Sequence, residues 1–452
     1  MGRTAPAETI AAQATAPGRG GLAVIRISGS LARAIGEALT QKKLAPRMAT
    51  YGHFKSPQGE IIDDGIAIYF PGPASFTGED VVELQGHGNP YVVDRLLTAV
   101  LAMGGRMARP GEFSERAFLN NKMDLAQAEA ISDLIAAESL IAARSALASL
   151  QGAFSREINV LVETLIALRT YIEAALDFPE EEVDFLTRGN IENKLLGLQT
   201  QLVNVSSEAQ QGSLLTEGMT LVIAGKPNAG KSSLLNALAG NELAIVTSVA
   251  GTTRDVLRAQ IQIDGVPLHV VDTAGLRPST DPIELEGIRR ALQEIQKADR
   301  ILLVVDACTN EIDTLEKVWP RDFCELPSSV PVTTIFNKCD LSGMPPSQGE
   351  NQLVLSAKTG AGMDLLKKHL KNAMGYQDGS AGRFSARRRH LQSLEIAGHH
   401  LSQALFELRQ KNGGELVAEE LRLAQQALEV ITGRFTPDDL LDKIFREFCI
   451  GK

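Results

Sequence analysis

Residues 225–232 constrain this chain most, because their spacing G-x-x-x-x-G-K-S is that of the phosphate-binding loop of nucleotide hydrolases. An apolar strand pattern over residues 219–224 precedes the loop, and a helical pattern over residues 233–238 follows it. The glycines let backbone N–H groups turn toward phosphate oxygens, and the helix N-terminus adds its positive end. In this arrangement Lys231 places a charge on the outer phosphates, and Ser232 ligates magnesium.

Two segments after this loop predict the groups that handle magnesium and the γ-phosphate. Asp272-Thr273-Ala274-Gly275 comes directly after the apolar strand pattern of residues 267–271. An Asp at such a place holds the magnesium shell, and the Gly N–H meets the γ-phosphate. Gly251-Thr252-Thr253-Arg254-Asp255 lies between the loop and that strand, and its Thr253 offers magnesium a second hydroxyl.

Two segments further along predict the base. Asn337-Lys338-Cys339-Asp340 ends a strand pattern over residues 332–336. An Asp there accepts both N–H donors of a guanine edge, whereas adenine presents the wrong pattern of donors and acceptors. Ser356-Ala357-Lys358 ends another strand and is expected to buttress the base. Each short motif is weak alone, but all of them, in this order and at strand ends, predict a GTPase.

Leu276 is a departure from the small signalling GTPases of the Ras kind, which carry a Gln there to orient the attacking water. Leucine has no group for that task, so either hydrolysis is slow or another residue takes the role. The candidate acid is Glu284, in a segment that opens the next helix. A solvated helix acid is the other interpretation of Glu284, and spacing alone favours it.

The composition is that of a globular protein, and 452 residues are too many for one core, so we expect roughly two to four domains. No apolar run reaches the ~18–20 residues of a membrane span, and no signal pattern opens the chain, so we expect a cytoplasmic protein without membrane contact. The cysteines Cys308, Cys324, Cys339 and Cys449 have no metal spacing and are expected as free thiols. Because the net charge is −10, any RNA contact must come from a local basic patch.

Residues 1–119 are predicted to form a mixed α/β domain. A strand pattern over residues 22–27 holds one charged side chain, Arg26, and residues 51–70 show two strand patterns around a turn, which predicts a hairpin. Residues 76–88 carry polar side chains among glycines, as in a loop that lines a ligand. An ordinary turn after a strand fits that segment equally well.

Residues 120–215 and 376–452 are predicted to be helical, whereas residues 216–375 alternate strand and helix. The alternation indicates a parallel, doubly wound sheet. The chain is therefore expected to carry a P-loop GTPase domain inserted into a helical domain. Arg387-Arg388-Arg389 opens one of the later helices, where it either contacts RNA or is a solvated helix end.

The combination of motifs resembles the MnmE family of tRNA-modification GTPases, also called TrmE. The resemblance covers the whole chain and rests on residues 225–233, Asp272-Thr273-Ala274-Gly275-Leu276, Pro17-Gly18-Arg19-Gly20-Gly21, Phe76-Thr77-Gly78-Glu79-Asp80 and the tail Cys449-Ile450-Gly451-Lys452. It implies an N-terminal α+β domain that binds folate and dimerises, a helical domain, and an inserted G domain. It also implies a homodimer that works with the flavoprotein MnmG, two copies of each, to add a carboxymethylaminomethyl group to C5 of the wobble uridine of certain tRNAs. The implied cofactors are Mg2+, K+ and formyl- or methylene-tetrahydrofolate, with GTP as substrate.

The resemblance further places site residues position by position. Potassium ligands fall on Asn228, Thr247, Val249 and Thr252, magnesium ligands on Ser232 and Thr253, and the hydrolytic acid on Glu284. Folate contacts fall on Arg26, Glu83, Lys122 and Lys452. In that set, Glu83 suits the aminopyrimidinone edge and the basic residues suit the glutamate carboxylates. Cys449 is expected to serve tRNA modification, with a plain buried thiol at a helix end as the other interpretation.

Together, the motifs and the resemblance assign the GTP contacts to Asn228, Ala229, Gly230, Lys231, Ser232, Ser233, Thr247, Ser248, Val249, Ala250, Gly251, Thr252, Thr253, Asp272, Thr273, Ala274, Gly275, Asn337, Lys338, Asp340, Ser356, Ala357 and Lys358.

Two other classes of protein share some of these features. A ribosome-assembly GTPase acts as a switch, and such proteins often add an RNA-binding module, for example one with a basic G-x-x-G loop; we find no such module in this sequence. The second class is a folate-binding or scaffold protein with a vestigial G domain. The complete guanine and magnesium motifs argue against that interpretation.

Overall fold

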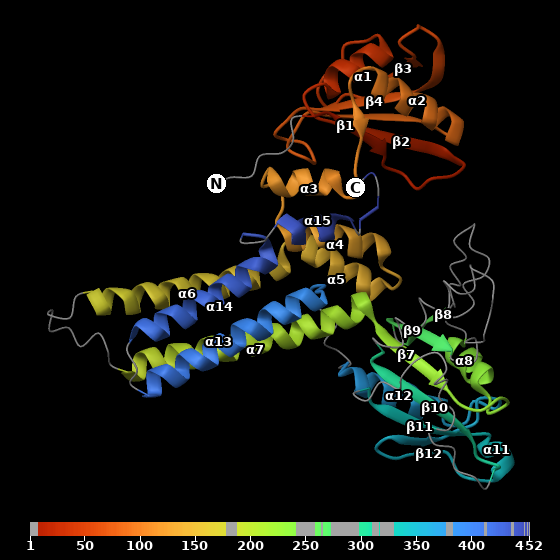
Figure 1. Cartoon of the computed structure of the whole chain (residues 1–452). Coiled ribbons are helices and arrows are strands. Elements are labelled where there is room, and N and C mark those ends of the chain that lie inside the picture. The colour runs from red at the N-terminus through yellow and green to blue at the C-terminus, as the bar shows by residue number, and fades with distance from the viewer. Residues whose placement is uncertain are drawn as a thin grey trace. The chain divides into compact units, whose positions relative to one another are not determined.

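The computed structural model describes residues 8–177, 188–240, 258–263, 265–272, 298–309, 316, 330–376, 383–410, 414–434, 438–446, 448–449 and 451. The chain forms two compact units (Figure 1). The first unit holds Met1–Ile135, Ser149–Leu202 and Ser393–Lys452, and the second holds Ala136–Ala148 and Val203–Gln392.

The first unit contains a six-stranded sheet in the order β3-β4-β5-β2-β1-β6. The strands are β1 (Ile10–Gln13), β2 (Gly20–Ser28), β3 (Thr50–Lys55), β4 (Ile61–Phe70), β5 (Val81–Gly88) and β6 (Arg106–Met107). All neighbouring strands are antiparallel except β1 and β6. The expected hairpin is confirmed as β3 and β4. The expectation of a loop over residues 76–88 is wrong for its second part, because β5 pairs with β2 and β4 on both sides.

The two faces of this sheet differ because side chains alternate along each strand. On one face, Ile25 and Leu84 pack in a core with Leu39 of α1 (Ala32–Thr40) and Leu96 of α2 (Pro90–Ala102). The alternate positions point to the other face, where Arg26 on β2 lies directly opposite Glu83 on β5. The folded sheet therefore sets these two charged side chains apart from the α1–α2 core.

Helices make up most of the rest of the first unit. They include α3 (Glu112–Leu119), α6 (Ala153–Asp177), α14 (Gly414–Thr432) and α15 (Asp438–Arg446), and α6 runs alongside α14 (Figure 1). Helices α4 (Leu125–Ala136), α5 (Leu140–Leu150), α7 (Arg188–Glu217) and α13 (Arg388–Gln410) have residues in both units. Leu125 of α4 shares a buried apolar cluster with Phe445 of α15, although the two are far apart in the sequence.

The second unit contains a seven-stranded sheet in the order β12-β13-β11-β10-β7-β9-β8. The strands are β7 (Met219–Ala224), β8 (Arg258–Ile263), β9 (Val266–Asp272), β10 (Arg300–Asp306), β11 (Val332–Asn337), β12 (Ser347–Gln348) and β13 (Gln352–Val354), and the helices are α8 (Lys231–Ala239), α11 (Cys339–Ser342) and α12 (Met363–Met374). The five inner strands are parallel, and only β8 and β12 run against their neighbours. This confirms the predicted doubly wound sheet.

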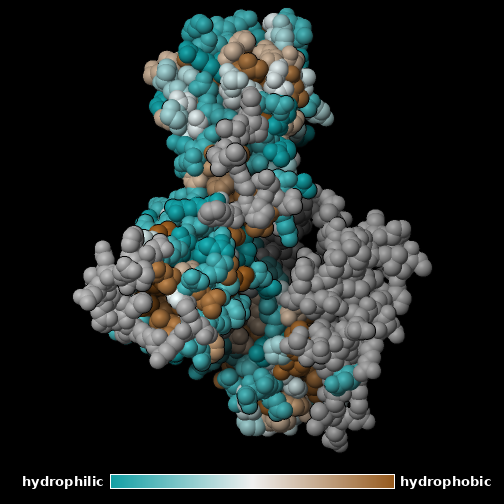
Figure 2. Space-filling model, turned by 60° about the vertical axis from the view of Figure 1, so that its left-hand side comes forward, coloured by the Kyte–Doolittle hydropathy of each residue, from teal (hydrophilic) through white to brown (hydrophobic). Residues whose placement is uncertain are grey.

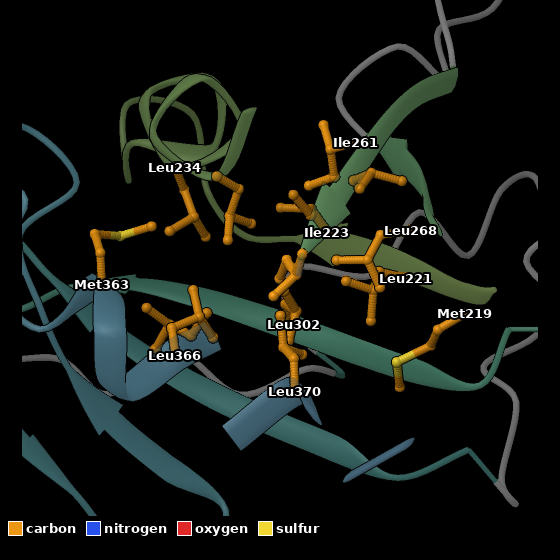
Figure 3. Close-up of a cluster of buried hydrophobic side chains, with 14 of the residues drawn as sticks. Met219, Leu221, Ile223, Leu234, Ile261, Leu268, Leu302, Met363, Leu366 and Leu370 are labelled. Atoms are coloured by element: carbon orange, nitrogen blue, oxygen red, sulfur yellow. The ribbon is translucent and has the colours of Figure 1, made fainter. Parts of the chain in front are cut away.

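The core of this sheet packs α8 against the central strands. Leu234 of α8 and Leu366 of α12 lie over Ile223 and Leu302 of the central strands in one cluster of buried side chains (Figure 3). Because strand order reverses beside β7, the loop that follows β7 lies at the topological switch point, where sheets of this kind bind ligands.

No described helix is long and apolar enough to cross a membrane. On the face drawn in Figure 2, the described atoms are mainly hydrophilic, with hydrophobic ones in scattered patches.

Candidate functional site

The loop between β7 and α8 has the backbone that a phosphate cradle requires. Gly225 and Gly230 have φ of +153° and +97°. A Cβ at Gly225 would lie 2.4 Å from the Val304 carbonyl oxygen, and one at Gly230 would lie 2.2 Å from Nδ2 of Asn337. Only glycine fits either place, since a side chain would collide with Val304 of β10 or with Asn337 of β11.

Lys231, the first residue of α8, closes the loop. Its Nζ donates to the carbonyl oxygens of Gly225 at 2.8 Å and Lys226 at 2.9 Å, and the residue is only 8% exposed. The ammonium group is thus held inside the turn of chain that precedes the helix, where the N-terminus of α8 adds positive potential. This is a site for anionic oxygens.

Three of the predicted oxygen donors at this loop are open to solvent. Ser232 and Ser233 are exposed in the first turn of α8, and Asn228 is exposed at the tip of the loop with a left-handed φ of +65°. Asn tolerates that conformation better than most residues. Ala229, in contrast, is buried and contributes its backbone.

Asn337, at the end of β11, joins three loops. Its Nδ2 donates to the carbonyl oxygen of Ala229 at 2.9 Å, and its Oδ1 accepts the N–H of Ala357 at 3.0 Å. The residue is 2% exposed, and a buried amide with both ends satisfied holds a rigid geometry. The phosphate loop and the predicted guanine segments are therefore fixed to one another through this side chain.

The remaining residues of the guanine segment lie at the same edge of the sheet. Lys338 has a left-handed φ of +69° and its Nζ pairs with Oδ2 of Asp306 at 2.6 Å, whereas Asp340 is exposed in the first turn of α11. The hydrogen bond from Lys338 holds the pKa of the Asp306 carboxyl below its usual range, and the N–H of Cys308 acts in the same direction. Asp306 was not among the predicted residues, and the only sequence signal for it is an acid that ends a buried strand.

The segment after β13 forms a tight turn next to this edge. Ser356 is fully buried, its N–H donates to the carbonyl oxygen of Ala361 at 2.8 Å, and its Oγ accepts the N–H of Thr359 at 3.2 Å. Ala357 is nearly buried and Lys358 is exposed. The turn places the backbone of Ala357 against Asn337.

The predicted hydrolytic residues are described only in part. The backbone of Asp272 pairs with Ile223 at the carboxyl end of β9, one position before the β7 strand ends. The register of these two strands therefore places the backbone of Asp272 close to the phosphate loop, which begins directly after β7. The predicted residues Thr247, Ser248, Val249, Ala250, Gly251, Thr252, Thr253, Thr273, Ala274, Gly275 and Glu284 lie outside the described residues.

A second cluster of predicted residues lies in the first unit, on the sheet face away from α1 and α2. Arg26 donates to Oε1 of Glu83 from Nε at 3.0 Å and from Nη2 at 2.9 Å. Its guanidinium carbon is 5.1 Å from the centre of the Phe76 ring and 5.7 Å from that of Phe113. The Arg26 cation therefore contacts one carboxylate and two aromatic faces.

Beside this pair lies a network of buried charges that the sequence did not reveal. Arg116 is fully buried and donates to Glu79 at 3.0 and 3.2 Å and to Glu112 at 3.1 Å. Glu79 also accepts the hydroxyl of Ser28 at 2.7 Å. The Nε of Arg116 is buried without a partner among the described residues. Since Ser28 is two positions from Arg26, the network braces the strand that carries Arg26.

Burial tends to raise the pKa of Glu112, but hydrogen bonds from Arg106, the N–H of Arg109 and Arg116 outweigh it and lower the pKa to about 2. The same contact raises the pKa of Arg106 above its already high value. Glu112 therefore stays ionised inside α3 at physiological pH.

Lys122 and Gly451 of the C-terminal tail lie close to segments that border the same sheet. Lys122 donates to the carbonyl oxygen of Pro73 at 3.0 Å, next to the segment that carries Phe76. In the C-terminal tail, Gly451 is buried with φ of +96°, and a Cβ there would lie 2.1 Å from the carbonyl oxygen of Gln13 at the end of β1. Lys452 lies outside the described residues, but its neighbour in the chain is packed beside the end of β1.

Cys449 is held at the start of this tail. Its carbonyl oxygen accepts the N–H of Gly111 at 3.4 Å, and Cys449 is an exposed residue with a free thiol. The alternative of a buried thiol at a helix end is therefore wrong. Cys308 and Cys339 are also free, and the described residues hold no group of three His, Cys, Asp or Glu side chains that fits a metal ion.

Comparisons with known proteins cover both units. Residues 9–122 match the family described as GTP-binding protein TrmE N-terminus, and residues 125–449 match the family described as MnmE helical domain.

Similar proteins span nearly the whole chain. The tRNA modification GTPase MnmE of Proteus mirabilis (strain HI4320) is 58% identical over 450 residues, which cover 98% of this chain and 99% of that one. The protein of the same name from Haemophilus influenzae (strain PittEE) is 59% identical over 98% of this chain and 100% of its own. The one from Yersinia pestis bv. Antiqua (strain Angola) is 57% identical, with 98% and 99% covered.

Proposed function

Because this chain belongs to the MnmE family of tRNA modification GTPases, we propose that it hydrolyses GTP to support the addition of a carboxymethylaminomethyl group to C5 of the wobble uridine of tRNA. The observation that carries the proposal is the 58% identity with a tRNA modification GTPase over 98% of this chain. The geometry of the phosphate loop supports it, because Lys231 is already held where it meets anionic oxygens.

In this proposal the described residues bind and orient GTP. Lys231 exchanges its two backbone acceptors for oxygens of the β- and γ-phosphates, and the N–H groups of the loop turn toward the same oxygens. Asp340 accepts the two N–H donors of guanine, and Asn337 keeps that segment fixed to the phosphate loop. Positioning of this kind supplies much of the rate in phosphoryl transfer.

The proposal includes magnesium, which would neutralise charge on the phosphates when bound. Ser232 fits that ion, because its hydroxyl is exposed in the first turn of α8, directly after Lys231, and magnesium prefers oxygen ligands. Thr253 is the second proposed ligand. The carboxyl end of β9 brings Asp272 to the same edge of the sheet as the loop.

Potassium is the second proposed ion, with Asn228, Thr247, Val249 and Thr252 as ligands. Asn228 fits it, because its amide is exposed at the tip of the phosphate loop. Leu276 has no group that orients a water, so we assign that role to Glu284, and we propose that two G domains of a homodimer pair during hydrolysis.

For the first unit, we propose a site for formyl- or methylene-tetrahydrofolate formed by Arg26, Glu83, Lys122 and Lys452. The support is that the Arg26–Glu83 pair joins β2 and β5, while Gly451 of the tail packs beside the end of β1, the strand next to β2. The folate would supply the one-carbon unit. Cys449, exposed in the same tail, is proposed to serve the modification step.

We further propose that the protein acts in the cytoplasm with the flavoprotein MnmG, two copies of each, and that the N-terminal domain, residues 1–119, carries the contact between the two copies of this chain. The helical domain, residues 120–215 and 376–452, and the G domain, residues 216–375, complete the proposed organisation.

Nucleoside analysis of tRNA from a strain that lacks this protein tests the function. The wobble-uridine modification should disappear and should return with the wild-type gene but not with a Lys231→Ala variant. An intact modification in the deletion strain would reject the proposal. If the deletion strain then accumulated incomplete ribosomal particles, the ribosome-assembly alternative would take its place.

A further inference from the structure

Asp306 ends β10 at the edge of the sheet where the guanine segment begins. Its Oδ2 pairs with Nζ of Lys338 at 2.6 Å, with 24% of the Asp306 side chain and 29% of the Lys338 side chain exposed. None of the roles assigned above to the nucleotide site includes this acid. It nevertheless contacts the side chain that lies between Asn337 and Asp340 in the chain.

The carboxylate of Asp306 is fixed by its own loop. Its Oδ1 accepts the N–H of Cys308 at 3.0 Å, and its carbonyl oxygen accepts the hydroxyl of Thr309 at 2.9 Å. The N–H of Ala307 also donates to the carbonyl oxygen of Asn337 at 2.9 Å, which joins this loop to the guanine segment. One oxygen of the acid is thus held by the backbone, and the other is presented to Lys338.

Among the described residues, Asp306 is the partner that the structure gives to the ammonium group of Lys338. Its backbone has the left-handed φ of +69° before the short helix α11. A lysine side chain has several rotatable bonds, and holding it in one place costs conformational entropy. If Asp306 already restrains the Lys338 side chain in the free protein, nucleotide binding does not incur that entropic cost again.

We propose that Asp306 is a positioning residue for nucleotide binding, which holds Lys338 in place at the base subsite before the nucleotide arrives. The proposal rests on the proposed GTP function of the same site. It predicts that Asp306 affects nucleotide affinity only through Lys338.

The experiment is a double-mutant cycle with the full chain, titrated with fluorescent mant-GDP. Asp306→Asn is the test variant, because it keeps an oxygen for the Cys308 N–H and removes the charge. We expect it to bind mant-GDP about three- to tenfold more weakly than wild type. In a Lys338→Met background, the same change should have almost no effect. An equal loss in both backgrounds, or wild-type affinity for Asp306→Asn, would overturn the proposal.

A matched control separates the ion pair from the general charge of the domain. Glu350→Gln removes one exposed negative charge from the turn between β12 and β13 and should leave the affinity unchanged. The loss in Asp306→Asn should also shrink at high salt, because ions screen a partly exposed pair. A loss that is the same at low and high salt counts against the ion pair.

A second ligand separates Lys338 from Asp340. Inosine diphosphate (IDP) lacks the exocyclic amine that donates a hydrogen bond to Asp340 in the proposed complex. The preference for GDP over IDP therefore reports on Asp340. Asp306→Asn should weaken both nucleotides equally and keep that preference. A collapse of the preference would show that Asp306 acts on Asp340 and would overturn the proposal. If the wild-type chain bound no mant-GDP at all, the proposed function itself would fail.

Discussion

Arg26 and Glu83 face each other across β2 and β5, and both hydrogen bonds of the guanidinium go to the same oxygen, Oε1, at 3.0 and 2.9 Å. The family resemblance assigns the two residues to separate parts of a folate. In the folded protein they are one ion pair, and the Arg26 guanidinium lies over the rings of Phe76 and Phe113. The proposed folate would therefore meet a paired unit, in which Oε2 of Glu83, with no hydrogen-bond partner among the described residues, would accept from the aminopyrimidinone edge.

The first prediction concerns this pair. Glu83→Ala should weaken formyl-tetrahydrofolate binding by about tenfold or more, because it removes a charged acceptor and leaves Arg26 without its partner. Isothermal titration calorimetry measures the affinity. Glu60→Ala, which breaks an exposed ion pair with Arg95 on the same domain, is the matched control and should bind normally. Unchanged affinity in Glu83→Ala would remove Glu83 from the site.

Guanine selectivity is predicted to depend on Asp340. Asp340→Asn replaces two acceptor oxygens by one acceptor and one donor, which suits xanthine better than guanine. The variant should lose GTP affinity and gain affinity for xanthosine triphosphate, with the preference changing by several powers of ten, as sites built on hydrogen bonding discriminate. Competition titrations with the two nucleotides measure it. Equal turnover of ATP and GTP by the wild type would contradict the guanine assignment.

Hydrolysis is predicted to need potassium held by Asn228. The wild type should turn over GTP much faster in potassium than in sodium at equal ionic strength. Asn228→Ala should lose this advantage in turnover rate, which we expect to be about 10²-fold, and should still bind GDP. Asn228→Ala strains a left-handed φ of +65°, so Asn228→Gly, which accepts that φ, is the companion variant. Equal wild-type rates in both salts would leave Leu276 without an explanation.

Cys449 is predicted to be needed for tRNA modification and dispensable for GTP hydrolysis. The thiol is exposed in the C-terminal tail of the first unit, whereas the phosphate loop belongs to the second unit. Cys449→Ser should abolish the wobble modification in cells and keep the GTPase rate of the purified protein. Cys308→Ser, a change at another exposed thiol, is the control and should keep the modification. Full modification with Cys449→Ser would refute the role.

The last prediction concerns stability and pH. The pKa of Glu112 is lowered from 4.5 to about 2, so its ionisation stabilises the folded first unit above pH 4.5, and that stabilisation is lost as the pH falls toward 2. A shift of this size corresponds to about 3 kcal/mol. Because the side chain is fully buried among Arg106 and Arg116, Glu112→Gln should cost about 3–5 kcal/mol at neutral pH.

Hydrogen–deuterium exchange of peptides from residues 8–119 measures this effect across the acid range. The wild type should lose protection between about pH 5 and pH 2, whereas Glu112→Gln should already be less protected at pH 7 and depend less on pH. A variant with wild-type protection at pH 7 would show that the network contributes little to stability.

Local patterns in the sequence are sufficient to predict the phosphate loop, the doubly wound sheet and the family. The spacing of Gly225, Gly230 and Lys231 admits few other structures, and the apolar runs that precede the motifs are long enough to be strands. Strand ends on a parallel sheet meet at one edge, so the motifs alone place Asn337 near the phosphate loop, and the hydrogen bond to Ala229 confirms it.

Partners from distant parts of the chain follow only from the tertiary fold. Arg26 and Glu83 form one pair because β2 and β5 are adjacent and in register. Asp306 meets Lys338 for the same reason at β10 and β11. Residues 81–88 form a strand, although their glycines indicate a loop, because neighbours on both sides supply the hydrogen bonds. Pairing between strands depends on sheet order and register, and local sequence carries little information on either.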